Sequence, residues 1–332
     1  LPINLPSGGG SAVEDCFFQP SGGATDFSSV ANAHTEIIDQ VVEVDEDLMA
    51  LYLEQGEELS PEQLHDPFEK ALREGHLVPV CFASAASGAG VPELLDVFER
   101  LMPNPGEGNP PPFLKGEGPD AEPVSVVPDP SLHVVAHVVK VSFDPFAGKL
   151  GVFRIHQGTV TPNTQLFVGD GRKPFTVSHL FKVQGREHVE VNAGIPGDIC
   201  AVGKVDDLHF DAVLHDSHDE DHFHLKSMDC PAPMYGLAIG LTKRGDEKKL
   251  SEALHRVSEE DPCLVVEQNA AANETVIRGL GELHLRVVLE RIQERYNLEL
   301  ETHPPSIPYR ETISANAEGH HRHKKQTDRK ST

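Results

Sequence analysis

The sequence has no tryptophan, four tyrosines, and few positive charges for a chain of 332 residues. Lys and Arg number 28 against 53 Asp and Glu, which gives a formal net charge of −25. A protein that binds nucleic acid through its overall charge needs a positive surface, so this balance argues against that class and leaves only a local patch open. Without Trp or a visible aromatic platform for base stacking, we expect no direct reading of RNA sequence.

No apolar run approaches the roughly 18 residues of a membrane span, so we expect no membrane association. The cysteines are odd in number, far apart and never in a CxxC motif: Cys16, Cys81, Cys200, Cys230 and Cys263. This pattern favours a reduced, cytoplasmic setting over a disulfide framework or a zinc site. The chain starts without an initiator Met or a charged leader and stops without a finished element, so we expect a fragment of a longer protein.

The first hundred residues carry helix signals with one strand signal among them. Apolar residues recur near the helical period over residues 34–53, and Ser60-Pro61 with Gln63 forms a capping box that opens a helix to about Glu74. Residues 76–84 predict a short buried strand, and another helix follows over 91–101. This order indicates the end of an open α/β sheet, in which ligands bind at loops that leave the carboxyl ends of strands.

A Pro/Gly-rich stretch over residues 106–130 predicts a linker with no element of its own. From residue 131 the apolar period changes to two. Six β-rich segments cover residues 133–143, 149–160, 164–169, 174–183, 188–194 and 198–205. Short strands at this spacing indicate a small closed β-barrel.

Residues 215–224, HDSHDEDHFH, combine histidines with acidic residues. The histidines are His215, His218, His222 and His224. We favour a solvated connector between domains, because composition alone fixes no ligand geometry; a bound metal is the alternative.

The segment from 227 to 303 predicts strand, helix, two strands, helix and strand, the order of a ferredoxin-like domain. Its second helix follows GLG at 279–281, which resembles the start of a dinucleotide-binding loop. The third glycine of that fingerprint would fall at His284, so the pattern fails. We expect both glycines to serve a sharp turn, through positive φ or close backbone approach, with Glu282 complementing the helix dipole.

Two long segments of the sequence carry specific motifs, FDPFAGKLGVFRIHQGTV and EEDPCLVVEQNAAANETVIRGLGELHL. They resemble the second and the third domain, respectively, of the bacterial elongation factor G family of ribosome-binding GTPases. PPSIPYRETI and GHHRHKKQT resemble the start of its fourth domain, and EVDEDLMALYLEQGEELSPEQL resembles the end of its GTPase domain. One departure is Leu280, where the family has Met.

The resemblance implies a multi-domain α+β fold: the C-terminal remnant of a P-loop-type α/β GTPase domain, a translation-factor β-barrel and a ferredoxin-like βαββαβ domain. The expected boundaries are 1–105 for the GTPase remnant, 106–130 for the linker, 131–214 for the barrel, 215–226 for the acidic/His connector, 227–303 for the ferredoxin-like domain and 304–332 for the start of the truncated fourth domain.

The resemblance also implies a nucleotide site in the full-length parent, which would bind GTP and Mg²⁺. Of the family's five GTP loops, this sequence matches only the fifth, S-A-x, at Ser84, Ala85 and Ala86, where the Ala85 amide would meet the guanine oxygen. No GxxxxGK[ST] or N-K-x-D motif occurs, and no Asp is placed to hold Mg²⁺. We therefore expect this chain neither to hydrolyse GTP nor to bind a cofactor, and we assign it no catalytic residue.

In the family, the GELHL turn faces the GTPase domain and borders the pocket of the antibiotic fusidic acid. By position, Gly281, Glu282, Leu283 and His284 would take that role, with Asp261 and Pro233 nearby. The alternative for His284 is a surface histidine that only packs.

The expected function is therefore that of a fragment of a monomeric factor that moves tRNA and mRNA on the ribosome, with rRNA and ribosomal proteins as partners of the parent. The basic tail from Glu318 is a candidate RNA contact, although a frayed end is the interpretation we favour. Two alternatives are a ribosome-recycling paralogue and a noncatalytic adaptor that binds a protein partner through the same domains. A metalloprotein built on residues 215–224 is a third.

Overall fold

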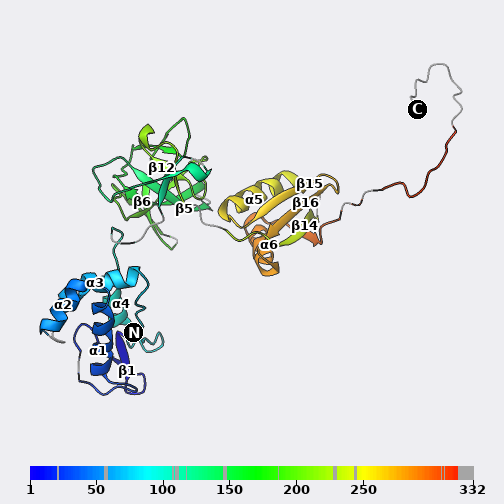
Figure 1. Ribbon diagram of the computed structural model, residues 1–332. Helices are drawn as coiled ribbons and strands as arrows, with labels where there is room; N and C mark the ends of the chain where they lie inside the picture. Colours follow the sequence, from blue (N-terminus) through cyan, green and yellow to red (C-terminus); the bar gives the residue numbers. More distant parts are fainter. Residues whose placement is uncertain are drawn as a thin grey trace. The chain divides into compact units, whose positions relative to one another are not determined.

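The computed structural model describes residues 1–20, 22–55, 59–106, 108, 112–116, 118–144, 148–185, 187–226, 230–242, 245–307, 309 and 311–320. The chain divides into two compact units. One consists of Leu1–Lys140 with Phe146–Ser227, and the other of Val141–Pro145 with Met228–Thr332. Figure 1 shows the helices and strands, coloured along the sequence. None of the helices in the described residues has the length and apolar character of a membrane span.

The first unit begins with a β-hairpin beside four helices. These elements are β1 (Asn4–Ser7), β2 (Ala12–Asp15), α1 (Val30–Val42), α2 (Glu46–Gln55), α3 (Pro61–Arg73) and α4 (Val91–Arg100). The capping box at Ser60 and Gln63 is present, as predicted. The periodic stretch over 34–53 is broken into two helices, because the Asp45 carboxylate accepts the amides of Asp47 and Leu48 at 3.1 and 3.0 Å and so begins a new helix.

Residues 76–84 form an extended segment, so the prediction of a buried strand there is wrong. Their ladder contact is a single parallel bridge between Val80 and Pro2. The side chain of Asn4, 3% exposed, takes the place of a neighbouring strand. Its Oδ1 accepts the Phe82 N–H at 2.6 Å and its Nδ2 donates to the Phe82 carbonyl at 3.1 Å. One side-chain amide therefore fixes the backbone just before residues 84–86.

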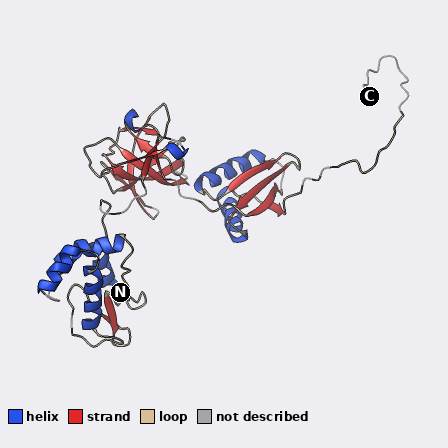
Figure 2. Ribbon diagram, in the orientation of Figure 1, coloured by secondary structure: helices blue, strands red, loops and turns tan. Residues whose placement is uncertain are grey.

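A curled, barrel-like sheet follows in the same unit (Figure 2). Its strand order is β10-β9-β11-β6-β5-β12-β7-β8. The strands are β5 (Val135–Asp144), β6 (Gly148–Gln157), β7 (Gln165–Val168), β8 (Phe175–Thr176), β9 (Leu180–Gln184), β10 (Glu187–Val191), β11 (Ile199–Gly203) and β12 (Val213–His215). All six predicted segments contain strands, and β12 was missed. Among the described strands β8 and β10 are the edges, so the expected closed barrel is an open, curled sheet here.

The stretch over 106–130 contributes to this unit, so the prediction of a linker without elements is wrong. It holds β3 (Phe113–Lys115), a 3₁₀ turn and β4 (Glu122–Val124), and β3 pairs with β13 (Phe223–Leu225) of the predicted connector. Phe113 and Leu225 pack with Val135 and Val213 in a small core. Apolar side chains at these few positions outweigh the turn-forming composition around them.

The second unit has the predicted ferredoxin-like order. Its elements are β14 (Tyr235–Leu241), α5 (Glu247–Glu260), β15 (Val265–Asn269), β16 (Glu274–Gly279), α6 (Glu282–Tyr296) and β17 (Leu300–His303). The antiparallel sheet has the order β15-β16-β14-β17. Apolar residues of both helices and of the sheet form one core, including Leu254, Ile277, Leu285 and Val288. The multi-domain α+β class predicted from the sequence is confirmed.

Candidate functional site at the N-terminus of α6

The turn between β16 and α6 contains the two glycines, which have different requirements. A Cβ on Gly279 would lie 2.7 Å from both Nδ1 of His284 and Cδ2 of Leu285, and Leu285 is fully buried. Close approach therefore excludes a side chain at 279, as expected. Gly281 has φ −177° and ψ −179°, and a Cβ there would meet nothing within 4 Å. The expectation of a special backbone need at Gly281 is wrong, because extended backbone suits any residue.

Two hydrogen bonds hold the ring of His284. The Leu280 backbone N–H donates to Nδ1 at 3.1 Å, and Nε2 lies 2.8 Å from Oδ2 of Asp261. Since Nδ1 accepts, the proton of the neutral ring is on Nε2 and is donated to the carboxylate. The side chains of His284 and Asp261 are 19% and 23% exposed, so both bonds are partly shielded from water.

Asp261 is the C-cap of α5 and shapes the turn into β15. Its Oδ1 accepts the Cys263 N–H at 3.0 Å, and its backbone carbonyl accepts the Leu264 N–H at 3.1 Å. His284 therefore links the turn before β15 to the turn before α6. The two turns come together because β15 is antiparallel to β16 and starts opposite Arg278, near the end of β16.

The other residues assigned from the resemblance lie at the same end of the sheet. Pro233 shortly precedes β14, which begins opposite Gly279. Glu282 and Leu283 are exposed in the first turn of α6, where the negative charge of Glu282 complements the helix dipole. The structure adds exposed apolar side chains at this edge that the sequence analysis missed: Met234, 87% exposed, and Leu280, 45% exposed. The sequence feature that could have identified them is an apolar residue just outside a strand, since Met234 precedes β14 and Leu280 follows β16.

Ser84, Ala85 and Ala86 lie in the other unit, in a turn before α4. The Ser84 N–H donates to the carbonyl of Ala89, and the Gly88 N–H donates to the carbonyl of Ser84, both at 2.8 Å. Ala85 and Ala86 are exposed. This loop is therefore exposed, and it directly follows the backbone that the side chain of Asn4 holds in place.

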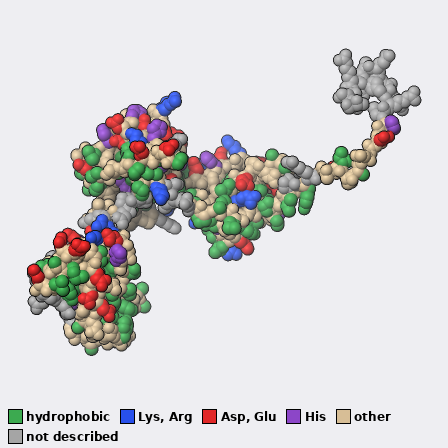
Figure 3. All heavy atoms as spheres, in the orientation of Figure 1, with side chains coloured by type: hydrophobic (Ala, Val, Ile, Leu, Met, Phe, Trp, Pro, Cys, Tyr) green, Lys and Arg blue, Asp and Glu red, His purple; other side chains and the backbone are tan. Residues whose placement is uncertain are grey.

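Acidic and histidine side chains gather on the visible face of the barrel-like part (Figure 3). His215 is 1% exposed, and its Nδ1 and Nε2 lie 2.7 and 2.8 Å from the carbonyl oxygens of Ser217 and Gly169. His215 is thus a buried residue whose ring links the end of β12 to the residue after β7. The prediction of a solvated connector is wrong for this residue. In the part of the chain that the structure describes, no group of three His, Cys, Asp or Glu side chains is placed to hold a metal ion.

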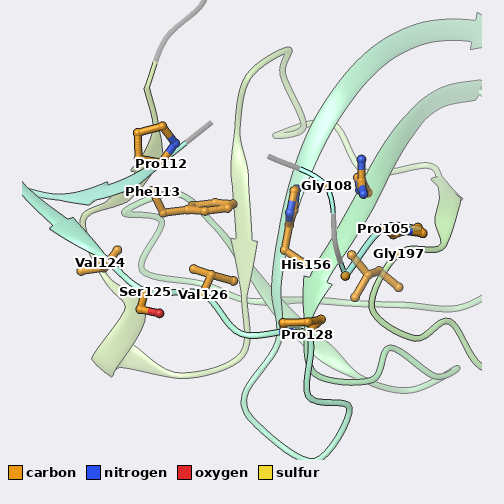
Figure 4. Close-up of a pocket in the computed structure, with 13 residues that line it drawn as sticks. Pro105, Gly108, Pro112, Phe113, Val124, Ser125, Val126, Pro128, His156 and Gly197 are labelled. Carbon is orange, nitrogen blue, oxygen red and sulfur yellow. The ribbon is translucent and has the colours of Figure 1, made fainter. Parts of the chain in front are cut away.

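A cavity of about 320 Å³ lies in the first unit, between the start of the Pro/Gly stretch and β6 (Figure 4). Phe113 and His156 face it, with ring centroids 5.0 Å apart in an edge-to-face arrangement. Burial lowers the pKa of His156 to about 4, and nearby Arg154 and His137 add to this effect. The described lining has no acidic side chain, and Nε of Arg154 is buried without a hydrogen-bond partner there. None of the residues assigned from the sequence lies in this cavity.

Comparisons with known proteins bear on both units. Residues 133–215 match the family described as Elongation factor G domain 2, and residues 230–304 match Elongation Factor G, domain III. The Elongation factor G-like protein of Mycobacterium tuberculosis (strain ATCC 25618 / H37Rv) is 32% identical, over 98% of this chain and 49% of that protein. Elongation factor G of Thermotoga maritima is also 32% identical, over 88% of this chain and 42% of that protein.

Among solved structures, the crystal structure of ttk003000868 from Thermus thermophilus is 31% identical, with a TM-score of 0.74. The match covers 93% of this chain and 46% of that one. Fold and comparisons together define a translation-factor chain in which a domain of the second type precedes one of the third type. The chain belongs to the elongation factor G family. It spans about half the length of the curated relatives that it matches.

Proposed function

We propose that the chain is part of a monomeric, cytoplasmic, ribosome-associated GTPase that moves tRNA and mRNA during translation. The consecutive matches to domains 2 and III and the relatives named elongation factor G support this proposal. The boundaries 1–105, 131–214, 227–303 and 304–332 predicted from the sequence belong to the same proposal, whereas the stretches 106–130 and 215–226 contribute strands to the first unit and are not proposed as a linker and a connector. The activity is one of the whole protein, since the chain spans half the length of its relatives.

The observation that carries the proposal is the surface around the Asp261–His284 pair. Two hydrogen bonds fix the turns on either side of the pair. Beside them the apolar side chains of Leu283 and Met234 are 63% and 87% exposed. Apolar side chains next to fixed polar groups are characteristic of a surface that another domain covers. We assign this covering role to the GTPase domain of the whole protein, so that its nucleotide state changes how it packs here. A pocket for fusidic acid would border the same edge.

This chain by itself does not hydrolyse GTP in our proposal. It carries Ser84, Ala85 and Ala86 but no sequence that matches the phosphate loop or N-K-x-D, so GTP and Mg²⁺ would be held mainly by other residues of the parent. Measuring phosphate release by the purified chain checks this directly. Turnover above that of a heat-inactivated sample would contradict it.

Co-sedimentation of the whole protein with ribosomes tests the function, with GDP and with a nonhydrolysable GTP analogue. We expect retention only with the analogue. Leu283→Glu places a charge in the proposed interface and should weaken retention by about tenfold, equivalent to about 1.4 kcal/mol. Leu53→Glu is the matched control, because Leu53 is also an exposed helical leucine, 78% exposed, far from this turn in sequence. Retention in neither nucleotide state would favour the adaptor, and splitting of ribosomes without tRNA movement would favour the recycling paralogue.

A further inference from the structure

Two cysteines lie at the same end of the ferredoxin-like sheet as the Asp261–His284 pair. Cys230 shortly precedes β14, and Cys263 directly precedes the segment that enters β15. Both strands are antiparallel to β16 and begin opposite its last residues, Gly279 and Arg278. The strand register therefore brings these two positions, distant in sequence, to one edge of the sheet.

The two thiols are also neighbours, because the electrostatic surroundings of the Cys263 thiol include that of Cys230 as a hydrogen-bonding group. Cys230 is exposed and Cys263 is half-buried, so an oxidant in solution reaches the first of them directly. Burial raises the pKa of the Cys263 thiol, and the contact with Cys230 and the nearby Asp261 carboxylate raise it further. An exposed thiol beside a second, less accessible one is the arrangement of an attacking and a resolving cysteine.

We propose that Cys230 and Cys263 are a redox-modification site that closes to a reversible disulfide beside the Asp261–His284 pair. Oxidised glutathione serves as the oxidant. The thiolate of Cys230 attacks one sulfur of oxidised glutathione, whose S–S bond breaks, and one glutathione leaves and takes up a proton. Cys263 then loses its proton to water and attacks Sγ of Cys230, which releases the second glutathione. The two thiols give up two electrons and two protons, and one oxidised glutathione becomes two reduced ones.

Formation of the disulfide would affect the Asp261–His284 pair through the backbone of the turn at Cys263. The Cys263 N–H donates to Oδ1 of Asp261, and the other carboxylate oxygen of Asp261 holds His284. A disulfide at Cys263 therefore constrains the turn that positions the histidine. This goes beyond the proposed function and does not depend on it, because the reaction is a property of the two thiols.

Cys16 and Cys200, two of the three remaining cysteines, serve as controls because both are buried. Burial, together with nearby acidic residues, raises the pKa of both Cys16 and Cys200 to about 11, and both side chains are 0% exposed. Thiols in such surroundings react slowly, so the disulfide should form without them.

The test treats the full chain with oxidised glutathione at mildly alkaline pH and digests it with trypsin under nonreducing conditions. Cys230 falls in the tryptic peptide 227–243 and Cys263 in 257–278, each of which contains one cysteine. We expect mass spectrometry to find these two peptides joined, with the loss of two hydrogens, and separated again by dithiothreitol. Cys230→Ser and Cys263→Ser should each abolish the joined species, and Cys16→Ser should retain it.

Two results would overturn the proposal. One is a stable glutathione adduct on Cys230 with no joined peptides, which would mean that Cys263 does not reach it. The other is no reaction at either residue under conditions that oxidise a small dithiol. The decisive species is read in the unsubstituted chain, so a variant that fails to fold does not remove the test.

Discussion

The substitution His284→Ala tests the polar centre of the site. It removes the acceptor of the Leu280 N–H and the donor to Asp261. A neutral hydrogen bond contributes about 1 kcal/mol and one to a charged group about 1.5–3 kcal/mol. Because both side chains of the pair are about a fifth exposed, the lower ends apply, and we expect a local loss of about 2 kcal/mol.

Native-state hydrogen exchange measures this loss at the affected amides. The Leu280 amide donates to the ring, so its exchange should accelerate by about 30-fold in His284→Ala, which corresponds to about 2 kcal/mol. Amides in the middle of α6, such as that of Val288, should change far less and serve as the internal control. Unchanged exchange at Leu280 would refute the assignment of Nδ1 as its acceptor.

Asp261→Asn separates hydrogen bonding from mere packing at the same position. Asp261 accepts from two donors, the Cys263 N–H and Nε2 of His284. An Asn side chain has one accepting oxygen and one donating nitrogen, so either orientation sets a donor against a donor. His284 cannot adapt by moving its proton to Nδ1, since Nδ1 faces the Leu280 N–H. We expect a cost of about 1–2 kcal/mol, and a coupling of about 1 kcal/mol in the double-mutant cycle with His284→Ala. Additive effects would show that the pair does not act as a unit.

Three further outcomes are expected. Gly279→Ala should lower the free energy of unfolding of its unit by about 1–3 kcal/mol through overpacking, whereas Gly281→Ala should change it by less than about 0.5 kcal/mol, as calorimetry can check. Asn4→Ala should cost about 2–3 kcal/mol and speed exchange at the Phe82 amide, which loses its partner. The folded pKa of His156 is below the ordinary value of about 6.5, so the unfolded state binds the proton first. Stability present above pH 6.5 is therefore lost as the pH falls towards 4. The loss in the free energy of unfolding is at most about 3 kcal/mol before solvent screening is considered. Urea titrations at several pH values should show this loss in the unsubstituted chain and not in His156→Gln.

The ferredoxin-like unit was predictable because the apolar residues of its helices recur at the helical period and its turns are short. The short β-rich segments at β14 and β16 and the helical stripe through Leu285 and Val288 each give one interpretation. The contact between Asp261 and His284 was not predictable from the residues, because it depends on the register of β15 against β16. The resemblance placed both residues in one region without showing that they bond.

The failures have physical causes at particular residues. In 106–130 the composition indicated a linker, but Phe113 is 3% exposed and pairs its strand with β13, more than one hundred residues later. At 76–84 an apolar run indicated a strand, yet its partners are a single backbone bridge to Pro2 and the side chain of Asn4, which no periodic pattern reveals. Gly281 was grouped with Gly279 by spacing, although only the latter faces packed atoms. Local sequence patterns reflect composition, whereas the structure at these positions depends on partners that are distant in the sequence.

The surface at the N-terminus of α6 combines features that suit a transient contact with a partner. Imidazole presents an acceptor and a donor on one rigid ring, so His284 can hold the Leu280 amide and the Asp261 carboxylate at once; a lysine has no acceptor, and an alanine has neither. Because both hydrogen bonds lie within this chain, they hold the turns before a partner docks, which reduces the ordering cost of docking. A permanently covered interface would be more uniformly apolar than this one, where Glu282 and Leu283 stand side by side in the first turn. A rigid polar centre with a few exposed apolar side chains therefore favours an interaction that depends on the state of the partner over a permanent one.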